Sequence, residues 1–314
     1  MNILVTDNCH PVLAEKLRAA GHQVDIKADY DYPTLLRDAA RYDALVVRSK
    51  VNIDRPFLDA NRHLRCIGRL GSGMETIDVA HASELGIACL NSPEGNGDAV
   101  GEHAVGMLLA LFDKICTGDA EVRQGIWRRE ANRGLEIMGK TIGIIGFGST
   151  GSAFARRLQG FGCRILAYDK YRAPGFAPPY VEECTLQDIQ RQAHVVSFHV
   201  PLRADTRHYL DRAFLDACAH PVYVINTSRG VVVNTPDLAA ALQDGKVLGA
   251  ALDVIEYEDM TKDGLAVDTL PPDFRLLTAS PRVVFTPHVA GWSVESKYKL
   301  AAVLADKMIA ALCS

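Results

Sequence analysis

The sequence predicts an α/β protein with two doubly wound parallel sheets, in which one domain is inserted into the other. Two patterns lead to this fold class. Residues 1–97 alternate short apolar runs with helical patterns, which is typical of a parallel sheet with helices on both faces. A second pattern of this kind begins in mid-chain, around a glycine-rich turn at residues 146–151. With 314 residues, 48% of them hydrophobic, the chain is long enough for about two such domains.

The first domain is expected to begin directly at the N-terminus. Its strands are predicted at residues 3–6, 23–26, 44–47, 64–67 and 87–90, and its helices at residues 12–20 and 32–41. Gly21 ends the first of these helices. A longer helix at residues 99–115 then leads into the second domain, because apolar residues recur there at helical spacing.

The second domain is expected to continue the same alternation. Its strands are predicted at residues 140–145, 163–168, 195–200, 222–226, 248–253 and 283–286. The amphipathic helix at residues 295–312 is too short to form a domain, so we expect it to return and pack on the first one. The predicted domains therefore comprise residues 1–97 with 287–314, and residues 98–286.

The glycine-rich turn has the form of a dinucleotide-binding fingerprint, since it follows an apolar run and opens a helical pattern. Gly146 would permit the tight turn, Gly148 would let backbone N–H groups approach a pyrophosphate, and Gly151 would let helix and strand pack closely. Ser149 and Thr150 would lie at the N-terminus of the helix, whose positive dipole end favours an anion. The turn therefore predicts a dinucleotide cofactor.

An acidic residue completes the fingerprint. Asp169 ends the next predicted strand, 18 residues beyond Gly151 (169 − 151). Its carboxylate would accept hydrogen bonds from the adenosine ribose and repel a 2′-phosphate, which favours NAD over NADP. Lys170 and Arg172 follow it and keep NADP open as an alternative.

Composition excludes several other classes of protein. A formal net charge of −4 gives no reason to expect nucleic acid or an anionic membrane as a partner. The N-terminus reaches Asp7 too early for a signal peptide, and no apolar run approaches the length of a membrane span. The eight cysteines form no CxxC pair and no cluster with metal-ligand spacing. We therefore expect a cytoplasmic protein with a small-molecule partner and no metal.

Three segments carry candidate catalytic residues, and each follows a predicted strand, where open α/β sheets bind ligands. They are residues 226–230 with Arg229, residues 253–258, and residues 286–292 with His288. Hydride transfer from a secondary alcohol needs a base for the hydroxyl proton, and histidine titrates in the right range. A carboxylate would orient that histidine, and arginine would hold a substrate carboxylate. Taken singly, each of these residues also fits an ordinary surface group.

Taken together, the motifs resemble the D-isomer-specific 2-hydroxyacid dehydrogenases. The likeness covers nearly the whole chain and includes residues 47–49, 68–73, 77–78, 91–96 and 102–104. It implies a Rossmann NAD-binding domain inserted into a flavodoxin-like substrate domain, with Arg229, Glu258 and His288 as catalytic residues. It also implies cofactor contacts from Pro201, Thr206 and Asp253, to which we add Thr227 and Gly291 from the same motifs.

Within this family the chain most resembles the D-3-phosphoglycerate dehydrogenases, which implies oxidation of D-3-phosphoglycerate in serine biosynthesis. Arg48 and Arg69 stand where arginines hold the substrate phosphate in those enzymes, although both could instead serve the substrate carboxylate or packing. Further substrate contacts are expected from Ser49 and from the N–H groups of the turn Gly71, Ser72 and Gly73. A glyoxylate or hydroxypyruvate reductase and a non-enzymatic, NAD-sensing corepressor-like protein are the alternatives.

The resemblance also implies a homodimer, formed through the helix near residues 99–115 and the segment around Trp127. Two departures from the family pattern stand out. Asp259 replaces the proline that usually follows the catalytic glutamate, and residues 259–281 form a longer segment than usual. We interpret this segment as a surface excursion, with a lid element beside the active site as the alternative. Because the chain stops at Ser314, we expect no C-terminal regulatory domain and no feedback inhibition by serine through one.

Overall fold

The computed structural model describes residues 1–258, 264–265 and 269–313, and it divides into two units. The smaller unit comprises residues 1–96 and 292–314, and the larger one residues 97–291. The second boundary therefore falls five residues later than the predicted change after residue 286 (291 − 286). The reason is that residues 288–290 hydrogen-bond to Asp253, which belongs to the larger unit.

The smaller unit has a five-stranded sheet in the order β2-β1-β3-β4-β5, and every neighbouring pair is parallel. This is the flavodoxin-like order, as predicted. The strands are β1 (Asn2–Val5), β2 (Gln23–Ile26), β3 (Ala44–Val47), β4 (Cys66–Arg69) and β5 (Ala88–Asn91). They lie within two residues of the predicted ranges, because short apolar runs mark buried parallel strands clearly.

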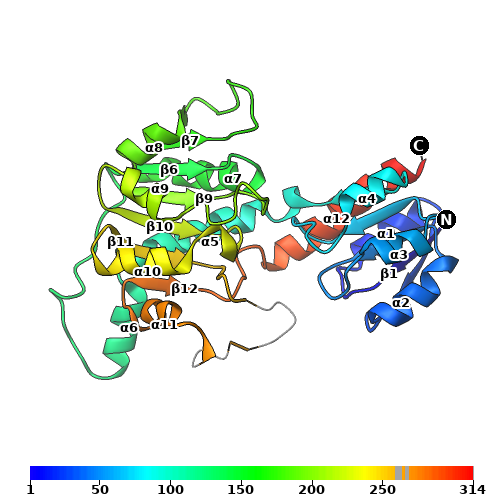
Figure 1. Cartoon of the computed structure of the whole chain (residues 1–314), viewed down its shortest axis with the longest axis horizontal. Helices are drawn as coiled ribbons and strands as arrows, with labels where there is room; N and C mark the ends of the chain where they lie inside the picture. The colour runs from blue at the N-terminus through cyan, green and yellow to red at the C-terminus, as the bar shows by residue number, and fades with distance from the viewer. Residues whose placement is uncertain (259–263, 266–268, 314) are drawn as a thin grey trace. The chain divides into compact units, whose positions relative to one another are not determined.

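Helices cover both faces of this sheet (Figure 1). One face packs against α1 (Val12–Ala19) and α12 (Val294–Cys313), and the other against α2 (Tyr32–Asp38), α3 (Arg55–Ala60) and α4 (Val79–Glu84). The C-terminal helix lies so close to β4 that a Cβ added to Gly68 would meet Met308 Sδ at 2.8 Å. The predicted return of the last helix onto the first domain is thus present within this unit.

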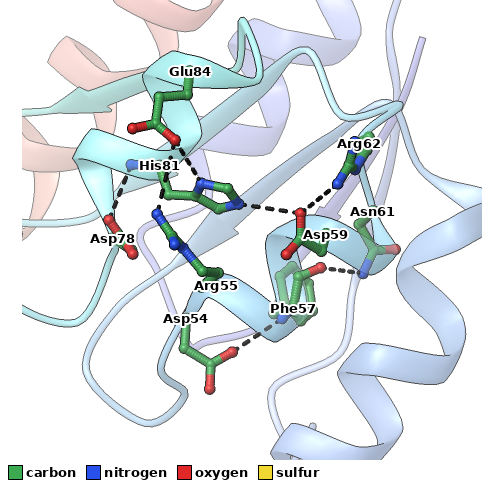
Figure 2. Close-up of polar contacts among 9 residues, drawn as sticks. All are labelled: Asp54, Arg55, Phe57, Asp59, Asn61, Arg62, Asp78, His81 and Glu84. Carbon is green, nitrogen blue, oxygen red and sulfur yellow. Dashed lines mark hydrogen bonds and ion pairs between the residues drawn. The ribbon is translucent and has the colours of Figure 1, made fainter.

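A buried histidine joins α3 to α4 (Figure 2). His81 Nδ1 lies 3.0 Å from Glu84 Oε2, and His81 Nε2 lies 3.2 Å from Asp59 Oδ1. The hydrogen bond to Glu84 raises the pKa of His81, partial burial opposes the rise, and Asp59 adds to it. Only a protonated imidazole can donate to both carboxylates, so this contact favours the charged form.

The larger unit has a seven-stranded parallel sheet in the order β12-β11-β10-β9-β6-β7-β8. Counted from β6, this is the Rossmann order with a seventh strand added, so the predicted fold class is confirmed. The strands are β6 (Thr141–Ile145), β7 (Arg164–Tyr168), β8 (Glu182–Glu183), β9 (Val195–Phe198), β10 (Val222–Asn226), β11 (Val247–Leu252) and β12 (Val283–Phe285). The strand order reverses between β6 and β9, which places the glycine-rich turn at the switch point.

Helices lie on both faces of this sheet (Figure 1). Two separate clusters of buried side chains pack between these helices and the sheet. One contains residues of α8 (Leu186–Gln192), α9 (Arg212–Ala217), α10 (Thr235–Gln243) and α11 (Pro272–Ala279). The other contains residues of α5 (Gly97–Phe112) and α7 (Ser149–Leu158). These two helices cross closely, since Gly97 and Gly101 of α5 have no side chain at the crossing. A Cβ on either residue would lie only 2.8 or 2.7 Å from backbone atoms of α7.

Two predicted segments differ from the structure. The helix expected at residues 99–115 ends at Phe112; Lys114 has a left-handed φ of 52°, and a new helix, α6 (Ile115–Arg123), follows. Part of the expected surface excursion is also α11, whose Phe274 and Leu277 are buried in the core at helical spacing. Asp259 and the rest of residues 259–263 and 266–268 lie outside the described residues.

Candidate active site

The three glycines of the turn each meet a different structural requirement. Gly146 has a φ of 89°, which side-chain-bearing residues rarely adopt. A Cβ on Gly148 would meet no atom of the described residues within 4 Å, so there is open space beside this residue. A Cβ on Gly151 would overlap the Gly146 carbonyl oxygen, which shows how tightly α7 packs on the turn. The positive φ of Gly146 and the close packing at Gly151 agree with the structural roles predicted for them, whereas the approach of a cofactor to Gly148 stays a prediction.

A pocket of about 270 Å³ lies beside this turn, at the carboxyl ends of β6, β7 and β9. Five of the predicted cofactor residues line it, namely Gly146, Gly148, Asp169, Pro201 and Thr206. Ser149 and Thr150 begin α7, whose first turn has no side-chain cap and therefore offers its N–H groups to an anion. The other predicted contacts, Thr227, Asp253 and Gly291, belong to segments outside the lining of this pocket.

Asp169 is fixed by two backbone hydrogen bonds. Its Oδ2 accepts from Phe147 N at 2.8 Å and its Oδ1 accepts from Tyr171 N at 2.9 Å. The carboxylate thereby ties the glycine-rich turn to the end of β7. Each oxygen keeps a lone pair for a further donor, such as a ribose hydroxyl.

Buried polar atoms without a partner in the described chain also fit a ligand at this end of the sheet. Neither His199 Nδ1, in the pocket lining, nor Thr227 Oγ1, after β10, has a hydrogen-bond partner among the described residues. Burial lowers the pKa of His199 to about 3, which favours the neutral form of this imidazole. Such atoms are costly to bury and are commonly satisfied by a bound molecule or water.

The structure brings together two of the three predicted catalytic residues. His288 Nδ1 lies 3.0 Å from Glu258 Oε2, and both side chains are partly exposed, at 27% and 24%. The carboxylate favours Nδ1 as the protonated nitrogen, which leaves Nε2 as a hydrogen-bond acceptor in the neutral ring. His288 also has a left-handed φ of 55°, which is uncommon for residues other than glycine.

Asp253 holds that backbone in place. Its side chain is buried, and Oδ1 accepts from Thr286 Oγ1 at 2.6 Å and from Val289 N at 2.9 Å, while Oδ2 accepts from Ala290 N at 3.0 Å. The Asp253 carbonyl accepts from His288 N at 2.7 Å. Both carboxylate oxygens are thus engaged with the loop that carries the histidine, a role that the sequence alone did not indicate.

The third predicted catalytic residue, Arg229, follows β10 on a segment built around Asn226. Asn226 Oδ1 accepts from Ser228 N at 3.0 Å, and Asn226 Nδ2 donates to the Arg229 carbonyl at 2.9 Å. The next residue must be glycine, because a Cβ on Gly230 would overlap the carbonyl of Ile255. The arginine segment and the loop that carries Glu258 are therefore packed backbone against backbone.

A second histidine–glutamate pair supports the same loop. His208 Nε2 lies 2.6 Å from Glu256 Oε1, and Glu256 Oε2 accepts from Thr235 N at 3.1 Å. Burial raises the pKa of Glu256, but the hydrogen bonds from His208 and Thr235 outweigh it and lower the pKa below its usual value. Sequence reasoning missed His208, because its partner Glu256 is 48 residues away and no local pattern indicates such a pair.

The predicted substrate-binding residues belong to the smaller unit, at the carboxyl ends of β3 and β4. The Arg48 guanidinium lies 4.4 Å from the ring centroid of Trp292, and Arg69 Nη1 donates to the Leu70 carbonyl at 2.9 Å. Ser49 follows Arg48 directly.

The turn Gly71, Ser72 and Gly73 follows β4. Gly71 has a φ of 144°, and Ser72 is held by Asn96 and Asn91 at 2.8 and 2.6 Å. The turn is therefore a fixed backbone element that can present N–H groups.

The described residues also lack two features. Within them, no group of three or more histidine, cysteine or acidic residues is arranged to hold a metal ion. Nor does this part of the chain contain a helix with the length and hydropathy needed to cross a membrane.

Comparison with known proteins identifies the family. The family model described as D-isomer specific 2-hydroxyacid dehydrogenase, NAD binding domain, matches residues 105–290, which lie within the larger unit. The chain therefore belongs to the D-isomer-specific 2-hydroxyacid dehydrogenase family, and its larger unit is an NAD-binding domain. The predicted family and cofactor are confirmed.

Individual relatives carry different names within that family. A D-3-phosphoglycerate dehydrogenase from Archaeoglobus fulgidus is 32% identical over 98% of this chain, which spans only 57% of that relative's length. A hydroxypyruvate reductase from Thermotoga maritima is 33% identical, with 87% of this chain and 86% of the relative covered. A crystal structure of a Thermus thermophilus protein superposes with a TM-score of 0.82 at 29% identity, covering 99% of this chain and 97% of that one.

Proposed function

We propose that this chain is an NAD-dependent dehydrogenase of D-2-hydroxyacids, in which Arg229, Glu258 and His288 carry the chemistry. The observation that carries the proposal is the 3.0 Å contact between His288 Nδ1 and Glu258 Oε2. A histidine oriented by a carboxylate is what proton removal from a hydroxyl requires. The same pair sits on loops that follow β11 and β12, beyond the carboxyl ends of the nucleotide-binding sheet.

When bound, NAD accepts a hydride from the carbon that bears the hydroxyl group. In this proposal His288 Nε2 takes the hydroxyl proton as the carbonyl forms, and Glu258 stabilises the imidazolium that results. The Arg229 guanidinium holds the substrate carboxylate by paired hydrogen bonds. In the reducing direction His288 begins protonated and returns the proton to the carbonyl oxygen, so reduction should be favoured at lower pH.

The direct test replaces His288 with asparagine, which preserves a polar side chain of similar reach but cannot accept and return the proton. We expect turnover to fall by about 10²–10⁴-fold, while the dissociation constant for NADH stays within a factor of about two. Unchanged turnover would refute the assigned role. If the unaltered protein binds NADH but oxidises no 2-hydroxyacid, the corepressor-like alternative gains support instead.

For the substrate, we propose D-3-phosphoglycerate, oxidised to 3-phosphohydroxypyruvate in serine biosynthesis. The support is the pair Arg48 and Arg69 at neighbouring strand ends of the smaller unit, where Val47 is the register partner of Arg69. Two guanidinium groups suit a phosphate, which takes paired hydrogen bonds from arginine. The Thermotoga relative's name supports the alternative, a hydroxypyruvate or glyoxylate reductase.

A substrate panel separates these alternatives. Reduction of NAD⁺ should be measured with D-3-phosphoglycerate, D-glycerate, D-lactate and 2-hydroxyglutarate. We expect a preference for the phosphorylated acid, and Arg48→Gln and Arg69→Gln should reduce that preference while D-glycerate oxidation changes less. Equal use of D-glycerate and D-3-phosphoglycerate by the unaltered protein would remove both arginines as phosphate ligands.

We also propose a cytoplasmic homodimer. The eight cysteines are all free thiols, which fits a reducing compartment. Large apolar side chains are exposed on α6 and the segment after it, namely Ile115, Val122, Ile126, Trp127, Leu135 and Met138. An exposed apolar surface of this kind is typical of a subunit interface. Light scattering after size exclusion should give twice the monomer mass, and Trp127→Asp should shift it toward the monomer.

A further inference from the structure

A small group of polar side chains lines the nucleotide pocket next to Asp169. Lys170 and Tyr171 follow β7, whereas Asp205 lies on the loop between β9 and α9. Lys170 Nζ and Tyr171 Oη both donate to Asp205 Oδ2, at 2.6 and 2.8 Å. One carboxylate oxygen therefore joins two loops that line the pocket. Tyr171 and Asp205, which it connects, are 34 residues apart in the sequence (205 − 171).

These contacts determine which charged side chains of the pocket are available to a bound ligand. The hydrogen bond to Asp205 raises the pKa of Lys170, and Lys170 and Tyr171 together lower the pKa of Asp205, so both groups are ionised and paired. The next cation on the same loop, Arg203, lies with its guanidinium 4.6 Å from the ring centroid of Tyr171. Both cations are thus engaged with groups of the protein.

Charge at this place decides between the two nicotinamide dinucleotides. NADP carries a phosphate on the 2′-oxygen of the adenosine ribose, where NAD has a hydroxyl. An acid at the end of the second strand, here Asp169, accepts from that hydroxyl, whereas a nearby cation accommodates the phosphate. Lys170 follows Asp169 directly and would be such a cation if Asp205 did not hold it.

We propose that Asp205 determines cofactor choice by holding Lys170 away from a 2′-phosphate. The pocket is thereby selective for NAD although it contains a lysine. This role concerns the nucleotide alone and rests on the NAD-binding domain, not on the hydroxyacid proposed above. A protein that binds nucleotide but turns over no hydroxyacid would leave the test below intact.

The test is to measure the dissociation constants of NADH and NADPH by nicotinamide fluorescence, with the full chain and no substrate. Asp205→Asn keeps the shape of the side chain, removes its charge and releases Lys170. We expect the ratio of the NADPH to the NADH dissociation constant to fall about tenfold, which corresponds to about 1.4 kcal/mol. Because the Asp205 side chain is 36% exposed, the substitution should leave folding intact, which thermal unfolding would verify.

Two further variants make the result specific. In Asp205→Asn combined with Lys170→Gln the gain for NADPH should disappear, because it depends on the released ammonium group. Asp306→Asn is the matched control, since Asp306 forms an ion pair with Lys16 at 2.7 Å in the smaller unit and its loss should leave the ratio unchanged. An unchanged ratio in Asp205→Asn would overturn the proposal, and so would a gain that persists without Lys170.

Discussion

Replacing Asp253 with asparagine tests whether this buried carboxylate holds the loop that carries His288. In the structure the carboxylate accepts three hydrogen bonds, from Thr286 Oγ1, Val289 N and Ala290 N. An amide can keep the first two on its oxygen, but its NH₂ group would then face Ala290 N, donor against donor. The substitution is nearly isosteric, so the loss of acceptor capacity is its main effect.

The size of the effect follows from those three bonds. A hydrogen bond to a charged partner contributes about 1.5–3 kcal/mol and one to a neutral partner about 1 kcal/mol. The two retained bonds should therefore weaken by about 1 kcal/mol each, and the lost one should cost about 2 kcal/mol. Relief from burying a charge offsets part of this. We expect the free energy of unfolding to fall by about 2–3 kcal/mol.

The assay is urea unfolding followed by circular dichroism, together with amide hydrogen exchange of Val289 and Ala290. Exchange at these two amides should accelerate strongly in Asp253→Asn. Asp216→Asn is a suitable control, because Asp216 is an exposed partner of Arg212 on α9 and its loss should cost less than about 1 kcal/mol. Stability within about 0.5 kcal/mol of the unaltered protein, with slow exchange at both amides, would refute the assigned role of Asp253.

Three other outcomes are expected. Glu258→Gln should lower turnover about 10²-fold without weakening NADH binding, since only the orientation and charge stabilisation of His288 are lost. Stopped-flow reduction measures turnover and NADH titration measures binding. Equal losses in turnover and in NADH affinity would contradict this prediction. Gly151→Ala should destabilise the larger unit by about 1–3 kcal/mol and weaken NADH binding, because the new methyl group overlaps the Gly146 carbonyl; a normal melting temperature would count against it. His81→Gln should be more destabilising at pH 5.5 than at pH 9, because the pKa of His81 is raised in the folded state. The stabilisation from His81 is fully present below the unfolded pKa of about 6.5 and is lost as the pH rises through the folded pKa. A difference in melting temperature that does not depend on pH would disprove this prediction.

Much of the fold was predictable because buried parallel strands are short, apolar and regularly spaced. The short helices were missed, although their start signals are visible in the sequence. Asp54 caps α3, which has a proline in its first turn, and Asp78 and Asp211 cap α4 and α9. Each of these three helices has only six residues, which is too few for a helical apolar pattern to emerge.

Site residues were predictable from the sequence only where they belong to a local sequence motif. Gly146, Gly151 and Asp169 could be assigned from local spacing, because one βαβ unit contains them all. The anchoring role of Asp253 could not, since its side-chain partners lie 33–37 residues away on another loop. Contacts of that kind depend on how strand ends meet at one edge of a sheet, and no local pattern records them.

The place of α12 has a consequence for biosynthesis. The larger unit is one continuous stretch, residues 97–291, and has been synthesised completely before α12 emerges from the ribosome. The smaller unit needs Leu304 and Met308 of that helix to cover one face of its sheet. Its five strands therefore keep one face partly uncovered while the larger unit is synthesised. During translation this N-terminal sheet therefore exposes apolar surface of the kind that promotes aggregation.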